Sequence, residues 1–236
     1  MPILDGGSAS GIPITHTTLS ITNEIVEVVN QQLQDDGFIQ WPPDDLIPYI
    51  NLAIAEVIRV RPIAYPVTKT ITLSAGSRQV IGTSEIQILD VVCNMIAGTS
   101  GTVVGTSTTI LPRRSLDSLI PNWQNFTSSN TVLHVIRDDF DPYTFYTFPP
   151  QPSGTTGLVR MIFSELPVEL ESIDDAFPLE QSYKIPVINY TLGLVLREET
   201  TIQGSQAKSD KCMAMFYNSL SVPLPQDKKR GGQPAT

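Results

Sequence analysis

The spacing of apolar residues changes twice along this chain, and each change marks a boundary in the fold. Apolar residues recur every three or four positions in residues 20–64 and 184–220, which is typical of amphipathic helices, whereas much of 65–167 alternates in the manner of strands. An amphipathic helix cannot bury its apolar side alone, so the two helical parts must pack together. The sequence therefore predicts an α+β fold: a bundle of about four helices with an inserted antiparallel β domain of about five to seven strands.

The first two helices are predicted from their capping residues and prolines. Thr22 is a suitable N-cap for the first, and Asp44 or Asp45 for the second. Pro48 removes a backbone donor, which costs little only in the first turn of a helix. We therefore place the start of the second regular helix near Leu46.

The last two helices are predicted in residues 184–200 and 205–220, with Ser205 as the N-cap of the second. Their apolar sides consist of Val187, Ile188, Leu192, Val195 and Leu196 in one helix, and of Cys212, Met215, Phe216 and Leu220 in the other. Both sides are expected to pack on the first helical pair.

The β domain is predicted from short segments rich in β-branched and aromatic residues. In its first strand we expect the Thr side chains and Lys69 to point outward, and Ile71 and Leu73 to point inward. The Gly- and Thr-rich residues 98–109 are interpreted as a hairpin tip or loop.

The predicted organisation follows from these segments. It comprises an N-terminal arm (1–19), the first half of a helical domain (20–64), the β domain (65–167), an acidic connector with the second helical half (168–222), and a C-terminal tail (223–236). Residues 161–183 carry six acidic side chains and no Lys or Arg, which fits either a solvated surface or the lining of a channel.

The charge balance argues against a protein that grips nucleic acid. The net charge is −9, with 15 Lys and Arg against 24 Asp and Glu, and binding to phosphates is driven by cationic side chains. Cys93 and Cys212 have no spacing typical of a disulfide framework or a zinc site. The first residues lack the pattern of a signal peptide, and no apolar run is long enough for a membrane span, so we expect a soluble protein made in a cytoplasm, without membrane contact.

The sequence offers few groups for catalysis. The only histidines are His16, in the predicted arm, and His134, in a predicted strand, and both are interpreted as structural. The acidic cluster Asp138, Asp139 and Asp141 contains oxygen ligands suited to a hard cation, but it lies between two strands, where Asp and Pro favour a turn. We predict no catalytic residue, cofactor or metal, and hence no enzyme.

Aromatic residues on both faces of one strand need two covering layers. Residues 143–150 (YTFYTFPP) and the nearby segment PNW at 121–123 have this pattern. Either the strand is sandwiched inside its own domain or a second subunit covers one face. The candidate subunit-interface residues are Trp123, Tyr143, Phe145, Tyr146 and Phe148.

The order of several segments resembles the head-to-tail adaptor family of short-tailed phages, which is related to head-completion and tail tubular proteins. These segments begin with Trp41 and residues 46–62, continue through Gly76 with Arg78-Gln79 and PRRSLDSLIPNW (112–123), and include RDDFDPYTFYTFPP (137–150) and FSELP (163–167). Tyr190, Ala207 and Phe216 in the last helices also fit. The resemblance covers residues 41–220; Pro48 and the acidic pair Glu198-Glu199 depart from it.

The resemblance implies a structural virion protein at the head–tail junction, assembled in the cytoplasm of a bacterial host. It implies a ring of about twelve copies that joins the portal protein to the tail nozzle protein and surrounds the passing genome DNA without binding it specifically. It also implies a C-terminal tail that reaches the portal, for which the candidate contacts are Lys228, Lys229 and Arg230.

Two alternatives remain open from the sequence. One is another neck or tail-completion protein, which would share the architecture but dock elsewhere. The other is a carbohydrate-binding or hydrolytic domain that uses the cluster Asp138–Asp141.

Overall fold

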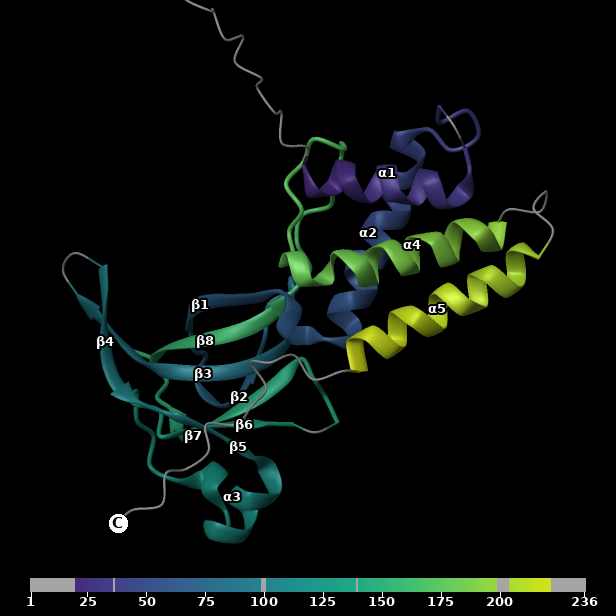
Figure 1. The fold of residues 1–236 in the computed structure, drawn as a ribbon. Coiled ribbons are helices and arrows are strands. Elements are labelled where there is room, and N and C mark those ends of the chain that lie inside the picture. The colour runs from purple at the N-terminus through teal and green to yellow at the C-terminus, as the bar shows by residue number, and fades with distance from the viewer. Residues whose placement is uncertain (1–19, 36, 99–100, 139, 199–203, 222–236) are drawn as a thin grey trace, which may run out of the picture.

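The computed structural model describes residues 20–35, 37–98, 101–138, 140–198 and 204–221. Within these ranges the chain is α+β, with five α-helices, three short 3-10 helices and eight strands in two four-stranded sheets. Figure 1 shows the helices α1, α2, α4 and α5 gathered at one end, the helical unit, and the strands with α3 at the other, the β unit. The predicted α+β class is confirmed.

The helical unit consists of α1 (Ile21–Leu33), α2 (Pro43–Val60), α4 (Lys184–Glu198) and α5 (Ser205–Ser221), which share one hydrophobic core. The central helix is α4, which packs against the other three. Figure 1 shows α2 crossing behind α4 instead of running beside it, so a regular four-helix bundle is not confirmed. The predicted apolar side of α4 is buried. Of the predicted side of α5, Phe216 and Leu220 are buried, Cys212 is half-buried and Met215 is exposed.

Both helix starts in the first pair differ from the prediction. The N-cap of α1 is Ser20, whose Oγ accepts from the Asn23 backbone N–H at 3.0 Å. Thr22 is instead buried, and its hydroxyl donates to the Asp175 carbonyl at 2.9 Å. The second helix begins at Pro43, upstream of Leu46, because the missing N–H of a proline costs nothing at the first helical position. Asp44 and Asp45 lie in the first turn and Pro48 within the helix.

The first sheet of the β unit has the order β1-β8-β3-β4, with antiparallel pairs throughout. Its strands are β1 (Pro66–Thr72), β8 (Leu158–Glu165), β3 (Glu85–Gly98) and β4 (Gly101–Ser107). Residues 98–109, interpreted as a hairpin tip or loop, include the strand β4, which forms an antiparallel hairpin with β3. The paired part is longer than expected, because Gly and Thr residues are also typical of loops.

The second sheet has the order β2-β7-β6-β5. Its strands are β2 (Gly76–Val80), β7 (Thr144–Gln151), β6 (His134–Arg137) and β5 (Thr109–Pro112). The pair β5–β6 is parallel, which departs from the purely antiparallel prediction. The short helix α3 (Arg113–Leu119), which was not predicted, forms part of the connection between these two parallel strands.

Lys69 lies on the inner face of the first sheet, contrary to the expectation that it points outward. Its register partner is Met161, which belongs to the core between the sheets. The Lys69 Nζ pairs with Glu85 Oε1 at 2.7 Å and also with Glu165. The two glutamates are directly opposite each other on β3 and β8, and Lys69 offsets the repulsion between these buried carboxylates.

Side chains of the helical unit hold the acidic segment after β8 by hydrogen bonds to its backbone. The Asn51 amide on α2 donates to the Leu170 carbonyl at 2.9 Å and accepts from the Leu170 N–H at 2.9 Å. Ser20 donates to the Ile173 carbonyl at 2.5 Å. Leu170 and Leu179 are buried in the helical core. Residues 166–183 are therefore packed against α1 and α2.

Candidate interaction surfaces

Three of the five candidate interface aromatics lie on the two faces of β7, Tyr143 directly precedes this strand, and Trp123 belongs to the segment that packs over one of its faces. Phe145 points into the core between the sheets, while Phe148 and Trp123 are buried on the other face beneath α3 and the adjacent 3-10 turn (Trp123–Asn125). Tyr146 is half-buried there and meets Trp123 edge-on, with ring centroids 5.7 Å apart. Only Tyr143 is mostly exposed, at 55%.

Both faces of β7 are thus covered within the same chain, one by the other sheet and one by α3 with the turn that follows it. Trp123, Phe145 and Phe148 form core contacts, and the Trp123 indole N–H donates to Asp117 at 2.8 Å. A role of the five residues in subunit contacts stays a prediction. Tyr143 offers the most surface for it, three residues after the exposed side chain of Phe140.

The acidic cluster between β6 and β7 forms turn hydrogen bonds. Asp138 accepts from the Phe140 N–H at 3.0 Å, and Asp141 accepts from the Tyr143 N–H at 3.0 Å. The hydrogen bond from the Thr144 side chain, followed by that from Tyr143, lowers the pKa of Asp141. Asp139 lies outside the described residues. These contacts favour the turn interpretation, and the described part of the chain contains no group of three or more His, Cys, Asp or Glu side chains placed to hold a metal.

The remaining sequence candidates are placed only in part. His134 on β6 bonds through Nδ1 with the Thr109 hydroxyl at 2.8 Å and stacks on Phe148. This is a structural environment, as predicted. His16 and the candidate portal contacts Lys228, Lys229 and Arg230 lie outside the described residues.

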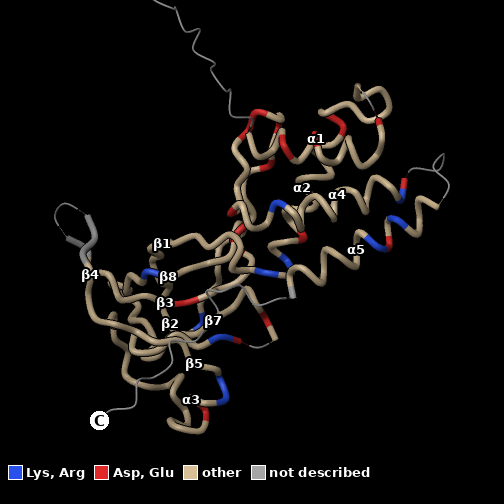
Figure 2. Tube along the Cα trace, viewed as in Figure 1, with Lys and Arg blue, Asp and Glu red and all other residues tan. Residues whose placement is uncertain are grey.

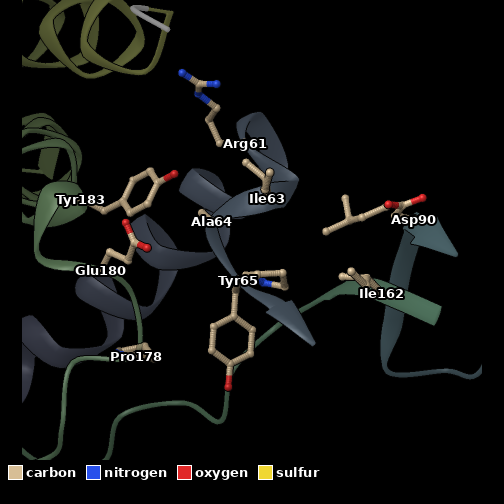
Figure 3. A pocket seen from close by; sticks show the side chains of 11 residues that line it. Arg61, Ile63, Ala64, Tyr65, Asp90, Ile162, Pro178, Glu180 and Tyr183 are labelled. Carbon is tan, nitrogen blue, oxygen red and sulfur yellow. The ribbon is translucent and has the colours of Figure 1, made fainter. Parts of the chain in front are cut away.

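A hollow of about 640 Å³ lies at the junction of the helical and β units (Figure 3). Its apolar lining includes Ala64 and Ile162, and its charged groups are Arg61, Asp90 and Glu180. The Arg61 Nε donates to the Leu220 carbonyl at 2.8 Å, which joins the ends of α2 and α5. No histidine, cysteine, serine or threonine is among the lining side chains, so the lining offers no nucleophile–histidine pair.

A second hollow, the acidic groove, runs between the outer side of α2 and residues 166–171. It comprises two adjoining cavities, of about 520 and about 60 Å³, that share Asn51, Ala55 and Glu169. Leu52 and Val168 contribute exposed apolar surface, and the charged side chains of the lining are Asp44, Glu169 and Glu171.

A third hollow, the basic groove, lies between α1, α4 and α5 and has a volume of about 510 Å³. Its floor is apolar, formed by side chains such as Ile188 and Leu192. Its charged side chains are Lys208 and Lys211 on α5. Burial raises the pKa of the Cys212 thiol in this groove, which favours the neutral form.

Figure 2 shows the same contrast along the backbone, with acidic residues gathered on the connector and the start of α1, and basic residues on α5. Neither groove could be predicted from the sequence, because each combines segments far apart in the chain. The acidic run in 161–183 is the one sequence signal for either of them.

The described chain is thus an α+β protein whose surface carries apolar grooves rimmed by charge. The family model described as SU10 adaptor protein matches residues 22–234, and the chain belongs to this family of bacteriophage adaptor proteins. It is accordingly a structural component of the virion that interacts with other virion proteins. No curated protein matches the chain. None of the described helices is long and apolar enough to cross a membrane.

Proposed function

We propose that this adaptor forms a ring of about twelve copies between the portal protein and the tail nozzle protein of a short-tailed phage, with the genome passing through its centre. The observation that carries the proposal is the family match over residues 22–234. A connecting role also agrees with the two surface grooves, because each combines apolar and charged side chains that another protein could contact.

The charge of the chain supports a passage for DNA without specific binding. The net charge of −9 gives the DNA phosphates little to bind, so a duplex can slide past such a surface. The exposed acids of the connector outside the acidic groove, such as Asp174 and Glu180, are candidates for a channel lining.

We further propose that the C-terminal tail contacts the portal through Lys228, Lys229 and Arg230. The family match continues to residue 234, beyond the end of α5 at Ser221, so it includes this basic cluster. Many identical tails on one ring would bind together, which multiplies a weak single contact.

Deletion of residues 224–236 tests the role of the tail. The truncated chain is expected to keep its circular dichroism spectrum, because the described cores end at Leu220, and to lose binding to purified portal rings of the same phage. A matched control deletes only 231–236 and retains the three basic residues, so it is expected to bind. Binding by the 224–236 deletion at the normal level would contradict the tail proposal.

The ring itself is tested by imaging the complex of the adaptor with portal rings. We expect a second ring stacked coaxially on the portal. A complex in which the adaptor binds at another place on the virion would instead indicate a different neck or tail-completion protein.

A further inference from the structure

We propose that the acidic groove of one copy receives the basic face of the next copy, so that the helical units form the subunit interface of the ring. This inference rests on the proposed ring and identifies the surfaces that close it. It also places the main contact in the helical unit, away from the aromatic residues of the β unit.

The two grooves are complementary in charge. The acidic groove contains Asp44, Glu169 and Glu171 and no Lys or Arg, whereas the basic groove contains Lys208 and Lys211 and no Asp or Glu. All five charged side chains are exposed. In the described part of the chain, none of the five forms an ion pair with another residue of its own chain.

Both surfaces also expose apolar side chains that a partner would cover. Val168 is 90% exposed at the acidic groove, and Leu52 and Leu166 are also mostly exposed there. On the basic side, Ile185 and Met215 are exposed beside the lysines. Apolar side chains surrounded by charges of one sign are typical of a docking surface, since burial supplies affinity and charge supplies orientation.

The positions of the grooves fit a head-to-tail contact. The acidic groove follows the outer side of α2, which crosses behind α4 in Figure 1, whereas the basic groove is formed by α4 with α1 and α5. The two complementary surfaces therefore lie on different sides of one rigid core. A contact between two different patches repeats from copy to copy and closes into a ring when the rotation permits, whereas a self-complementary patch would stop at a dimer.

Charge reversal on one side at a time tests this interface. The variant Lys208→Glu/Lys211→Glu and the variant Glu169→Lys/Glu171→Lys are each expected to lose ring assembly, with association weakened at least about tenfold because attractive contacts become repulsive. Assembly is measured as mass, by native mass spectrometry and sedimentation, for the purified chain and for the chain bound to portal rings. Circular dichroism verifies that each variant is folded.

Combination of the reversals makes the test specific. A chain that carries all four substitutions has both patches exchanged in sign, so its copies are complementary again and rings are expected to return. A matched control in the β unit, Arg114→Glu/Arg160→Glu, changes the net charge as much as the lysine reversals and is expected to assemble normally.

The outcomes separate this inference from the proposed function. If the wild-type chain forms rings and both single-side reversals still form them, the interface lies elsewhere and this inference is overturned while the ring stands. If the four-substitution chain stays monomeric although folded, charge pairing between these grooves is likewise refuted. A wild-type chain that is monomeric both alone and on portal rings would overturn both proposals.

Discussion

At the scale of single residues, the Lys69 site combines a charge cluster with a hydrophobic core. The hydrogen bonds to Glu165 and Glu85 raise the pKa of Lys69. Burial is the largest influence on the Glu85 carboxyl and acts to raise its pKa, but Lys69 and neighbouring hydrogen bonds bring the pKa below its ordinary value. Lys69 therefore stabilises the charged form of Glu85 against the cost of its burial.

Replacement of Lys69 by Met is expected to lower the free energy of unfolding at pH 7 by about 2 kcal/mol, less than the loss for a fully buried pair because Lys69 keeps some solvent contact. The depressed pKa of Glu85 stabilises the wild type above the unfolded value of 4.5, and this contribution is lost as the pH falls through the folded pKa. In Lys69→Met the ionised Glu85 lacks its partner, so protonation of Glu85 costs the variant less stability than the wild type. The deficit in the free energy of unfolding therefore shrinks on acidification.

Urea unfolding at pH 7 and pH 4 measures both effects of Lys69→Met. The matched control adds Glu85→Gln and Glu165→Gln, which removes the uncompensated charges and is expected to recover most of the stability at pH 7. An equal deficit at both pH values would show that the electrostatic account is wrong.

At the scale of elements, the N-cap of α1 links a helix to the connector. Ser20 caps the helix and also donates to the Ile173 carbonyl, while Thr22, the cap expected from sequence, holds the Asp175 carbonyl. Ser20→Ala is expected to destabilise the chain by about 1 kcal/mol or slightly more, because it removes both bonds. Ser20→Thr is the control: its hydroxyl keeps an acceptor for the Asn23 N–H and a donor for the Ile173 carbonyl, so it should retain most of the stability.

Thermal or urea unfolding of the two Ser20 variants measures the difference. Hydrogen exchange adds a local readout, since Ser20→Ala should speed exchange at Asn23, whose N–H loses its acceptor. Unchanged exchange at this amide would argue against the cap.

The elements also show how far the sequence could predict the fold. Residues 187–196 have a strong period, and the predicted side of α4 is buried because helical spacing is a local signal. By contrast, the parallel pair β5–β6 joins strands that are separated by α3 and a long connection, and α3 is held by Leu116 packing with Trp123 and Ile136. The strand β4 pairs with the strand directly before it, but its Gly and Thr residues resemble those of a loop. Lys69 was misplaced because a charged residue inside a sandwich requires partners, here Glu85 and Glu165, that the strand sequence alone does not identify.

The candidate surfaces were predictable to a smaller degree. The alternative that β7 is covered on both faces within its own domain agrees with the burial of Phe145 and Phe148. The acidic connector was visible as a run of charge, but its apposition to α2 through Asn51 and Leu170 depends on the fold. The basic groove could not be predicted from any one sequence segment, because its lining comes from α1 near one end of the chain and from α4 and α5 near the other.

At the scale of the whole molecule, the chain has separate helical and sandwich cores. We expect them to unfold in distinguishable steps, because each core has its own buried apolar cluster. Ile50→Ala in the helical core and Phe163→Ala in the sandwich core are expected to cost about 2–5 kcal/mol each, and each should lower mainly its own transition. Calorimetry resolves the transitions, and far- and near-ultraviolet circular dichroism follow the loss of helix and of aromatic packing. A single transition that both substitutions lower equally would contradict independent cores.

The bond between Arg61 and the Leu220 carbonyl also has a mechanical consequence. A partner that pulls on the chain beyond residue 221 transmits tension first to the end of α5. The guanidinium passes this tension to the end of α2, next to the short turn Pro62–Ala64 that leads into β1. A pull on the C-terminal end would thus reach the boundary of the two units, and not α5 alone.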